Sequence, residues 1–299
     1  MKILVTGANG QLGQCLRDII EKSNNRKYKW FWTDVVETDR EVDTLDITDV
    51  DAVRKYVKKN KIDTVVNCAA ATNVDGVEDN VEFARLLNIT AVKNLASICE
   101  EYDARLIHIS TDFVFGDDKC SPYTPEDETN PLSVYGKTKL AGEAEIKESG
   151  CKYVIIRTAW LYSKYGNNFL KTMTKLMDTK KEIKVVNDQI GTPTYAPDLA
   201  DIIYTAVRRE KISGVYHFTN EGVCSWYDFA CMIRSCVVRN TEVIGITTDE
   251  YYKDGKPHAV RPHYSVLDKS KTKTDFDYEP VWWAERVLQC VNELSKNNN

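Results

Sequence analysis

The sequence predicts an α/β fold in which helices cover both faces of a doubly wound parallel sheet. In the first half of the chain, short apolar runs typical of buried strands alternate with longer segments whose apolar residues recur at helical spacing. A glycine-rich turn at residues 7–13 follows the first strand directly. Strands joined by helices imply right-handed crossovers. Ligands of such sheets bind beyond the carboxyl ends of the strands.

The predicted elements follow one another in that rhythm. Strands are expected at residues 3–5, 29–33, 64–70, 105–110 and 152–157. Helices are expected at 12–20, from a capping box that begins at Thr48, over one long segment at 83–102, and from near Tyr135. The carboxyl ends of the strands should therefore bring one set of residues to a single crevice: Gly7, Ala70, Thr111 and Thr158.

Composition excludes several classes of protein. The 299 residues are 42% hydrophobic and 28% charged, and the net charge of −5 argues against general binding to nucleic acid or to an anionic membrane. No apolar stretch approaches the ~20 residues of a membrane span, and the N-terminus enters a strand rather than a signal peptide. The nine cysteines contain no C-x-x-C pair and the four histidines have no metal-ligand spacing. We expect a cytoplasmic protein with reduced thiols and no metal. Whether it forms a homodimer is left open by the sequence.

The glycine turn has the context of a phosphate-binding loop. Gly7, Gly10 and Gly13 stand between an apolar strand and an amphipathic helix. This order places unpaired backbone N–H groups at a helix N-terminus, where a pyrophosphate can bind. Gly7 would allow the tight turn, Gly10 a close approach of phosphate, and Gly13 contact between helix and strand. The sequence therefore predicts a Rossmann-type dinucleotide site.

A tyrosine and a lysine four residues apart suggest what the dinucleotide does. Tyr135 and Lys139 would share one face of a helix, and Thr111 would lie at the end of a neighbouring strand. A free tyrosine titrates near pH ~10, and a nearby ammonium is expected to lower that pKa toward the working range. The Thr111 hydroxyl could hold a carbonyl against the phenol. This is the proton-donating half of a carbonyl reduction, for which a nicotinamide supplies hydride.

From residue 160 the alternation of strands and helices loosens. Loop signals become frequent, as at Gly191-Thr192-Pro193, with a strand expected at 215–219 and a helix at 226–237. We expect a dinucleotide-binding Rossmann domain at 1–159. A smaller lobe at 160–299 is expected mainly to bind the substrate. Segments of this part are expected to return to the Rossmann sheet, so that the two parts are partly interleaved.

Several blocks together give the chain a resemblance to the extended short-chain dehydrogenase/reductase superfamily. Within it the chain resembles the dTDP-4-dehydrorhamnose reductase family. The glycine and Tyr/Lys blocks are common to the superfamily, whereas residues 72–75, Trp160 and Arg261-Pro262 point to the reductases. Phe113 departs from the tyrosine usual in the family. The matching blocks lie at residues 7–13, 67–75, 110–115, 135–143, 157–162, 188–194 and 261–265.

The resemblance implies NADPH- or NADH-dependent reduction of the C4 keto group of dTDP-4-dehydro-L-rhamnose, a nucleotide-sugar, to dTDP-L-rhamnose. Tyr135 would protonate the C4 alkoxide, Thr111 would orient the keto oxygen, and Lys139 would hold the nicotinamide ribose. Asp46 and Ile47 would lie at the adenine. The cofactor residues it implies are Gly7, Asn9, Gly10, Gln11, Leu12, Gly13, Asp34, Asp46, Ile47, Ala69, Ala70, Tyr135 and Lys139. The substrate residues are Thr72, Val74, Asp75, Glu78, Thr111, Trp160 and Arg261.

The choice between the two cofactors depends on competing charges. Asp34 follows the second strand, where a carboxylate accepts from the adenosine ribose hydroxyls and repels a 2′-phosphate. Arg26 and Arg40 could still reach that phosphate, so we expect use of both cofactors. Similarly, Arg261 would supply a cation to the nucleotide diphosphate.

Other functions remain open at this point. A nucleotide-sugar epimerase or dehydratase of the same superfamily is one alternative. Dehydratases commonly add an acidic pair at the Ser/Thr site, whereas here Asp112 is followed by Phe113. The other alternative is non-catalytic, since a relative of these reductases serves as the regulatory subunit of methionine adenosyltransferase and retains the Tyr/Lys pair.

Overall fold

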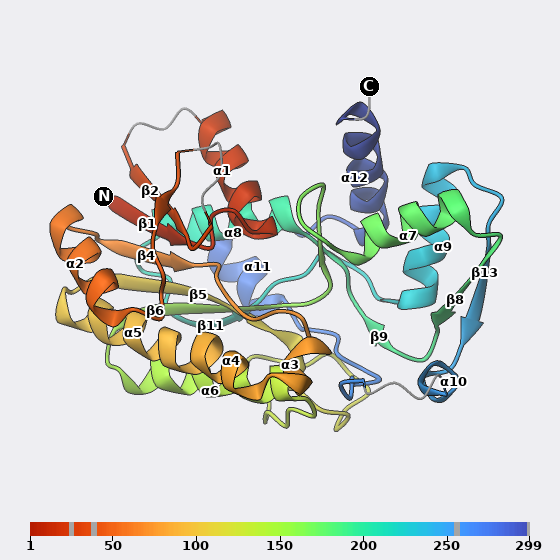
Figure 1. The fold of residues 1–299 in the computed structure, drawn as a ribbon, viewed down its shortest axis with the longest axis horizontal. Coiled ribbons are helices and arrows are strands. Elements are labelled where there is room, and N and C mark those ends of the chain that lie inside the picture. Colours follow the sequence, from red (N-terminus) through yellow and green to blue (C-terminus); the bar gives the residue numbers. More distant parts are fainter. Residues whose placement is uncertain (24–26, 37–40, 254–257, 298–299) are drawn as a thin grey trace.

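The computed structural model describes residues 1–23, 27–36, 41–253 and 258–297. Its centre is a seven-stranded sheet in which every described pairing is parallel. The order β3-β2-β1-β4-β5-β6-β11 is that of a doubly wound Rossmann sheet extended by one strand (Figure 1). The strands are β1 (Lys2–Thr6), β2 (Lys29–Asp34), β3 (Asp43–Thr44), β4 (Thr64–Asn67), β5 (Arg105–Thr111), β6 (Lys152–Thr158) and β11 (Gly214–His217).

Alternation along the strands divides the core into two layers. In β1, Ile3 and Val5 face the helices α1 (Gln11–Ser23) and α8 (Ala196–Arg208). Leu4, between them, faces α2 (Val50–Asn60), α5 (Ala91–Glu101) and α6 (Val134–Glu148) on the opposite side. Figure 1 shows these two groups of helices on the two faces of the sheet. The predicted doubly wound α/β class is confirmed.

A second lobe lies beside the sheet, on the right of Figure 1. Its core contains aromatic and aliphatic residues from three helices, α7 (Phe169–Thr179), α9 (Trp226–Val237) and α12 (Trp283–Asn297). Three short pairs of strands complete it: β7 (Leu161–Tyr162) with β10 (Thr194–Tyr195), β8 (Glu182–Val186) with β13 (Glu242–Ile246), and β9 (Ile190–Gly191) with β12 (Cys224–Ser225). Between these segments the chain returns to the sheet to form α8 and β11, and later α11 (Ser270–Phe276), which packs near β11.

The segment predicted as one helix at 83–102 is interrupted. It forms α4 (Val81–Arg85), a π-helical turn η1 (Leu86–Thr90) and then α5. The side chain of Asn88 in this turn bonds the amide and carbonyl of Ala71, at 3.0 and 3.2 Å, and the hydroxyl of Thr138, at 3.1 Å. Gly142 of α6 lies directly against the Asn88 carbonyl, where a Cβ would clash. The extra residue of the π turn turns Asn88 toward these partners.

Five other elements differ from the sequence prediction. The helix α2 begins after Asp49, whose carboxylate accepts from the amides of Asp51 and Ala52, so Thr48 is not its cap. The strand β4 ends at Asn67 rather than at residue 70. The Asn67 side chain accepts from the Thr6 hydroxyl and from the Ala69 amide, so the Ala69 amide does not pair with a neighbouring strand. Short helices α3 (Gly76–Asp79), η2 (Asp112–Val114) and α10 (Thr248–Tyr252) were not anticipated.

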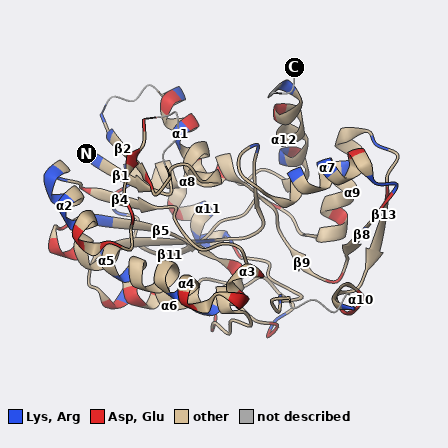
Figure 2. Ribbon diagram, in the orientation of Figure 1, with Lys and Arg blue, Asp and Glu red and all other residues tan. Residues whose placement is uncertain are grey.

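Charge is distributed over the outer helices, where Figure 2 shows basic and acidic residues of α2 and α6 interspersed. Over the described ranges, no helix has the length and apolar character that crossing a membrane requires. Within the same ranges, no group of three or more His, Cys, Asp or Glu side chains has the geometry to hold a metal ion. All nine cysteines are free thiols.

Candidate active site

The glycine turn between β1 and α1 is built so that only glycine fits at two of its three positions. Gly7 has φ +67°, and a Cβ there would lie 2.7 Å from the Ala69 amide nitrogen. A Cβ on Gly13 would clash with the Gly7 carbonyl, so α1 packs tightly on the turn. At Gly10 the one atom near a Cβ is the Gly7 oxygen at 3.1 Å, which leaves the loop open at the N-terminus of α1. This open turn fits a dinucleotide pyrophosphate.

Asp34, at the carboxyl end of β2, holds the glycine loop. Its carboxylate accepts from the amide of Asn9 at 2.9 Å and from the amide of Val36 at 3.3 Å. The side chain therefore orders the loop from the carboxyl end of β2. Arg26 and Arg40, which the sequence offered as partners for a 2′-phosphate, lie outside the described residues.

The other predicted cofactor residues fall into two groups. The side chains of Leu12 and Ile47 are buried in the two core layers, so only their backbone atoms could contact a cofactor. The remaining residues are partly or fully exposed at the carboxyl edge of the sheet or beside it. Asp46 is one of them, and it accepts from the Thr48 amide and hydroxyl at 2.8 Å each. The others are Gln11, Ala69 and Ala70.

The proposed catalytic residues converge at the ends of β5 and α6. Thr111 is the last residue of β5, and Tyr135 and Lys139 lie in the first turns of α6, which Ser133 caps by accepting from the Gly136 amide at 3.1 Å. A hydrogen bond joins the side chains of Thr111 and Tyr135. The phenol also packs against the ring of Phe113, with centroids 5.8 Å apart. The structure therefore brings this predicted triad together.

The acidity of Tyr135 differs from the expectation. Burial raises the pKa of Tyr135 to about 12, the hydrogen bond with Thr111 opposes this rise, and the charge of Asp112 adds to it. The expected direction, a pKa lowered by the neighbouring lysine, is therefore wrong for this geometry. The reason is the direction of the lysine: Lys139 Nζ donates to the Ile109 carbonyl at 2.7 Å and contacts His108 Nε2 at 3.1 Å. Burial lowers the pKa of Lys139 to about 8, although Glu143 opposes this shift.

Asp112 places a second buried carboxyl group beside the triad. One oxygen accepts from the Thr111 hydroxyl at 3.0 Å, and the other is buried without a hydrogen-bond partner within the described part of the chain. Burial raises the pKa of Asp112 to about 6, and the nearby Ser265 and Thr111 hydroxyls oppose this rise. A buried polar atom left without a partner is costly. It marks this corner as a place for a hydroxyl-bearing ligand.

Asp75 and Arg261, both predicted to bind substrate, contact each other. Arg261 Nη2 donates to the Asp75 carboxylate at 2.7 Å, and the Ala259 amide donates to the same group at 3.0 Å. Burial acts to raise the pKa of Asp75, but these hydrogen bonds outweigh it and hold the pKa below its ordinary value. Arg261 is therefore already engaged with a carboxylate, and the sequence did not identify Asp75 as its partner.

The other predicted substrate residues surround the same side of α6. Glu78 accepts from the Val134 amide at 2.8 Å, next to Tyr135 in the first turn. Thr72 is exposed and Val74 is half-buried in the loop after β4. The loop thus lies beside the triad, as expected from its place in the sequence.

Trp160 stands where the chain leaves β6 for the second lobe. Its ring stacks on that of Trp226, with centroids 3.7 Å apart and planes 13° from parallel. Its φ of +48° is unusual for a residue other than glycine, and Gly191 leaves room for the ring, because a Cβ there would lie 2.8 Å from it. Strain of this kind persists where the surroundings hold a side chain in a required position.

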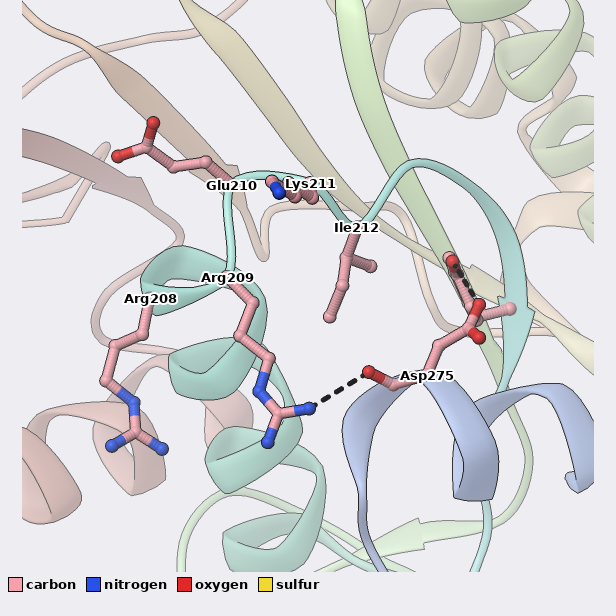
Figure 3. A pocket seen from close by; sticks show the side chains of 7 residues that line it. Arg208, Arg209, Glu210, Lys211, Ile212 and Asp275 are labelled. Atoms are coloured by element: carbon pink, nitrogen blue, oxygen red, sulfur yellow. Dashed lines mark hydrogen bonds between the residues drawn. The ribbon is translucent and has the colours of Figure 1, made fainter.

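The pocket drawn in Figure 3 lies elsewhere. It is lined by residues 208–212 at and after the end of α8, by Tyr216 of β11 and by Asp275 of α11. The amino end of β11 belongs to the edge of the sheet opposite Gly7 and Thr111. Because ligands of doubly wound sheets bind at the carboxyl edge, this pocket is separate from the candidate active site.

Sequence reasoning missed the polar side chains that support the triad. His108 and Asn67 are fully buried in β5 and β4 and bond each other, with Asn67 Nδ2 3.1 Å from His108 Nδ1. The available signal was a polar residue within an apolar run expected to form a buried strand, as at His108 in residues 105–110.

The geometry is matched by the comparisons with known proteins. A family model described as the RmlD substrate binding domain matches residues 1–296. The chain belongs to this family. It is 35% identical to the dTDP-4-dehydrorhamnose reductase of Escherichia coli K12, over 98% of each chain. It is also 36% identical to the spore coat polysaccharide biosynthesis protein SpsK of Bacillus subtilis, again over 98% of each.

Solved structures of RmlD-family members have the same fold. A dTDP-4-dehydrorhamnose reductase from Clostridium acetobutylicum superposes with a TM-score of 0.89 at 42% identity, over 99% of this chain and all of that one. The Bacillus anthracis reductase, solved in complex with NADP, gives a TM-score of 0.88 at 35% identity, over 98% of this chain and 99% of the other. The resemblance seen in the sequence is confirmed.

Proposed function

We propose that this RmlD-family chain is an NAD(P)H-dependent dTDP-4-dehydrorhamnose reductase, which converts dTDP-4-dehydro-L-rhamnose to dTDP-L-rhamnose for polysaccharide precursors. The observation that carries the proposal is the convergence of Thr111, Tyr135 and Lys139 at the carboxyl edge of the sheet, beside an open glycine loop. Full-length relatives named for this activity support it.

The residues of the chain divide the work of a carbonyl reduction. The nicotinamide supplies hydride to C4 of the ketosugar. Tyr135 donates its phenolic proton to the developing C4 alkoxide, and a pKa of about 12 keeps that proton on the phenol at neutral pH. The Thr111 hydroxyl would orient the keto oxygen, and Lys139 would bind the nicotinamide ribose.

Both reduced cofactors fit the site on chemical grounds. Asp34 presents a carboxylate at the end of β2, where it accepts from ribose hydroxyls and disfavours a 2′-phosphate. The NADP complex of the Bacillus anthracis relative supports binding of NADPH as well. The cofactor side of the site comprises the glycine loop, Asp34, Asp46 and the residues that follow β4.

The substrate side is assigned to the loop after β4 and to the second lobe. Asp75 and Glu78 lie beside the start of α6, and the buried Asp112 oxygen without a partner suits a sugar hydroxyl. Trp160 offers an aromatic face to the sugar, and Arg261 a guanidinium to the diphosphate. Thr72 and Val74 complete the loop. The nine free thiols suit a cytoplasmic enzyme, and size-exclusion chromatography with light scattering tests for a homodimer.

The decisive experiment follows NADPH absorbance after addition of freshly prepared dTDP-4-dehydro-L-rhamnose. We expect oxidation of NADPH and formation of dTDP-L-rhamnose, identified by mass spectrometry and NMR. Tight NADPH binding without turnover of this or any related ketosugar would instead favour a regulatory subunit. Release of water or a change of configuration without net NADPH consumption would favour a dehydratase or an epimerase.

A further inference from the structure

Four buried polar side chains form a continuous hydrogen-bonded row that ends at Lys139 of the triad. The Thr6 hydroxyl donates to Asn67 Oδ1 at 2.7 Å, Asn67 Nδ2 lies 3.1 Å from His108 Nδ1, and His108 Nε2 lies 3.1 Å from Lys139 Nζ. The row crosses β1, β4, β5 and α6 in turn. None of its members is more than 2% exposed, so water does not compete for these contacts.

The orientation of the Asn67 amide is fixed by a backbone group. The Ala69 amide donates to Asn67 Oδ1 at 3.2 Å, and a peptide N–H can only donate. The oxygen therefore faces Ala69, and the NH₂ group must face His108 Nδ1. Since an amide NH₂ also only donates, His108 Nδ1 is the acceptor and carries no proton.

This assignment determines the state of the histidine. Because Nδ1 carries no proton and burial holds the pKa of His108 well below its ordinary value, the ring is neutral and has one N–H. With Nδ1 accepting, that proton is on Nε2, which faces Lys139 Nζ. An ammonium has only donors and would oppose this N–H, whereas a neutral amine has a lone pair that accepts it.

We propose that His108 is a positioning residue that favours the neutral amine of Lys139 over its ammonium in the free enzyme, so that at alkaline pH binding of the dinucleotide is linked to proton uptake by Lys139. The inference rests on the proposed function. In this state the amine donates to the Ile109 carbonyl and accepts from His108. A bound dinucleotide brings hydroxyl acceptors and phosphate charge, and the lone pair then takes a proton from solvent to form the ammonium.

The charges around Lys139 are compatible with this linkage. Among the described residues, His108 of β5 and Glu143 of α6 are the titratable groups that act on it, and Tyr135 lies one turn earlier on the same helix. Glu143 favours the ammonium, but its carboxylate is already occupied by Arg157 and Ser110. Burial dominates and leaves the pKa of Lys139 at about 8.

The first test observes the tautomer in the wild-type protein. With ¹⁵N-labelled histidine, the ring nitrogen shifts of His108 should show a proton on Nε2 and none on Nδ1 at pH 9, where the amine form of Lys139 prevails. His217, another fully buried strand histidine, serves as the internal reference. A proton on Nδ1 of His108 would overturn the proposal, and this measurement does not depend on any variant folding.

The second test counts protons by titration calorimetry of NADPH binding in buffers of different ionisation enthalpy. If Lys139 returns to an ordinary lysine pKa of ~10.4 in the complex, wild type should take up roughly 0.8 proton per site at pH 9 and almost none at pH 6.5. In H108Q the carboxamide oxygen can accept from the ammonium, so uptake at pH 9 should fall below about half of the wild-type value.

His217→Gln is the matched control, because His217 lies in β11 and contacts Tyr123 and Arg157 rather than Lys139. This variant should keep the wild-type proton uptake. NADPH binding without proton uptake in wild type, or equal uptake in H108Q, contradicts the proposal. Absence of NADPH binding contradicts the proposed function instead, so the two failures are distinguishable.

Discussion

Arg157 and Glu143 form a buried ion pair that fastens α6 to β6. Arg157 Nε and Nη2 donate to the two carboxylate oxygens at 2.9 and 2.7 Å, and neither side chain is more than 2% exposed. Ser110 donates to the same carboxylate at 2.6 Å. Glu143 follows Lys139 by one helical turn, so this pair sets the position of the helix that carries the catalytic residues.

Replacing Glu143 by Gln should destabilise the fold by ~3–5 kcal/mol at pH 7, because it leaves the guanidinium buried without its counter-charge. Burial acts to raise the pKa of Glu143, but Arg157 outweighs it and lowers the pKa. The pair therefore stabilises the fold above the unfolded glutamate pKa of ~4.3, and this stability is lost as pH falls through the lower folded value. Urea unfolding at pH 7 and pH 3.5 should show a smaller acid loss in E143Q than in wild type. Glu145→Gln, which breaks only a surface pair with Lys93, should change stability by less than ~1 kcal/mol.

Tyr135→Phe should reduce kcat by ~10²–10⁴-fold while NADPH affinity stays near that of wild type, because the phenol donates the proton but is not the main cofactor anchor. Lys139→Ala should weaken both turnover and cofactor binding. Steady-state kinetics and fluorescence titration measure the two effects. Tyr165→Phe removes a phenol that bonds Asp18 away from the triad and should retain wild-type kcat. A wild-type kcat in Y135F would end the catalytic assignment.

Asp34→Ala should shift the ratio of kcat/KM values toward NADPH, since a carboxylate that repels the 2′-phosphate is removed. Wild type itself should prefer one cofactor by less than ~100-fold. The variant should also bind both cofactors less tightly, because Asp34 accepts from the Asn9 amide in the glycine loop. Asp34→Asn keeps an acceptor for that amide and separates the two effects. An unchanged ratio in both variants would mean that Asp34 does not face the ribose.

Arg261→Ala should raise KM for the nucleotide-sugar about tenfold to a hundredfold, the equivalent of the ~1.5–3 kcal/mol of a charged hydrogen bond, with kcat little changed. Asp75→Asn weakens the ion pair between Asp75 and Arg261 and leaves the guanidinium free for substrate. Comparing the two variants therefore separates the ion pair's contribution from that of substrate binding. If KM stays constant in R261A and Tm falls, Arg261 is a structural ion pair and other residues bind the diphosphate.

Gly191→Ala should raise KM with little effect on kcat, because its Cβ would meet the Trp160 ring at 2.8 Å and displace it from Trp226. Trp160→Ala should raise KM in the same direction if the ring packs on the sugar. Quenching of tryptophan fluorescence on binding of the product, dTDP-L-rhamnose, independently measures contact between the ring and the sugar. An unchanged KM in both variants would assign Trp160 to the core of the lobe.

The sequence predicted those features that depend on neighbouring residues. The glycine turn and the Tyr135–Lys139 pair follow from local spacing, and the parallel sheet follows from alternating strands and helices. The contact between Asp75 and Arg261 joins residues 186 positions apart, and no local pattern encodes it. The break at η1 was also hidden, because the apolar spacing continues through residues 86–90 and only the tertiary partners of Asn88 reveal it.

Asn88 has a consequence for how the molecule can be altered. Its one carboxamide binds the loop that carries the predicted substrate residues through Ala71, and the catalytic helix through Thr138. Gly142 brings that helix so near that no side chain can be accommodated between them. Redesign of the sugar loop for another ketosugar must therefore preserve residues 88 and 142. A change at either would move the acid away from the carbonyl while the redesigned pocket itself stayed intact.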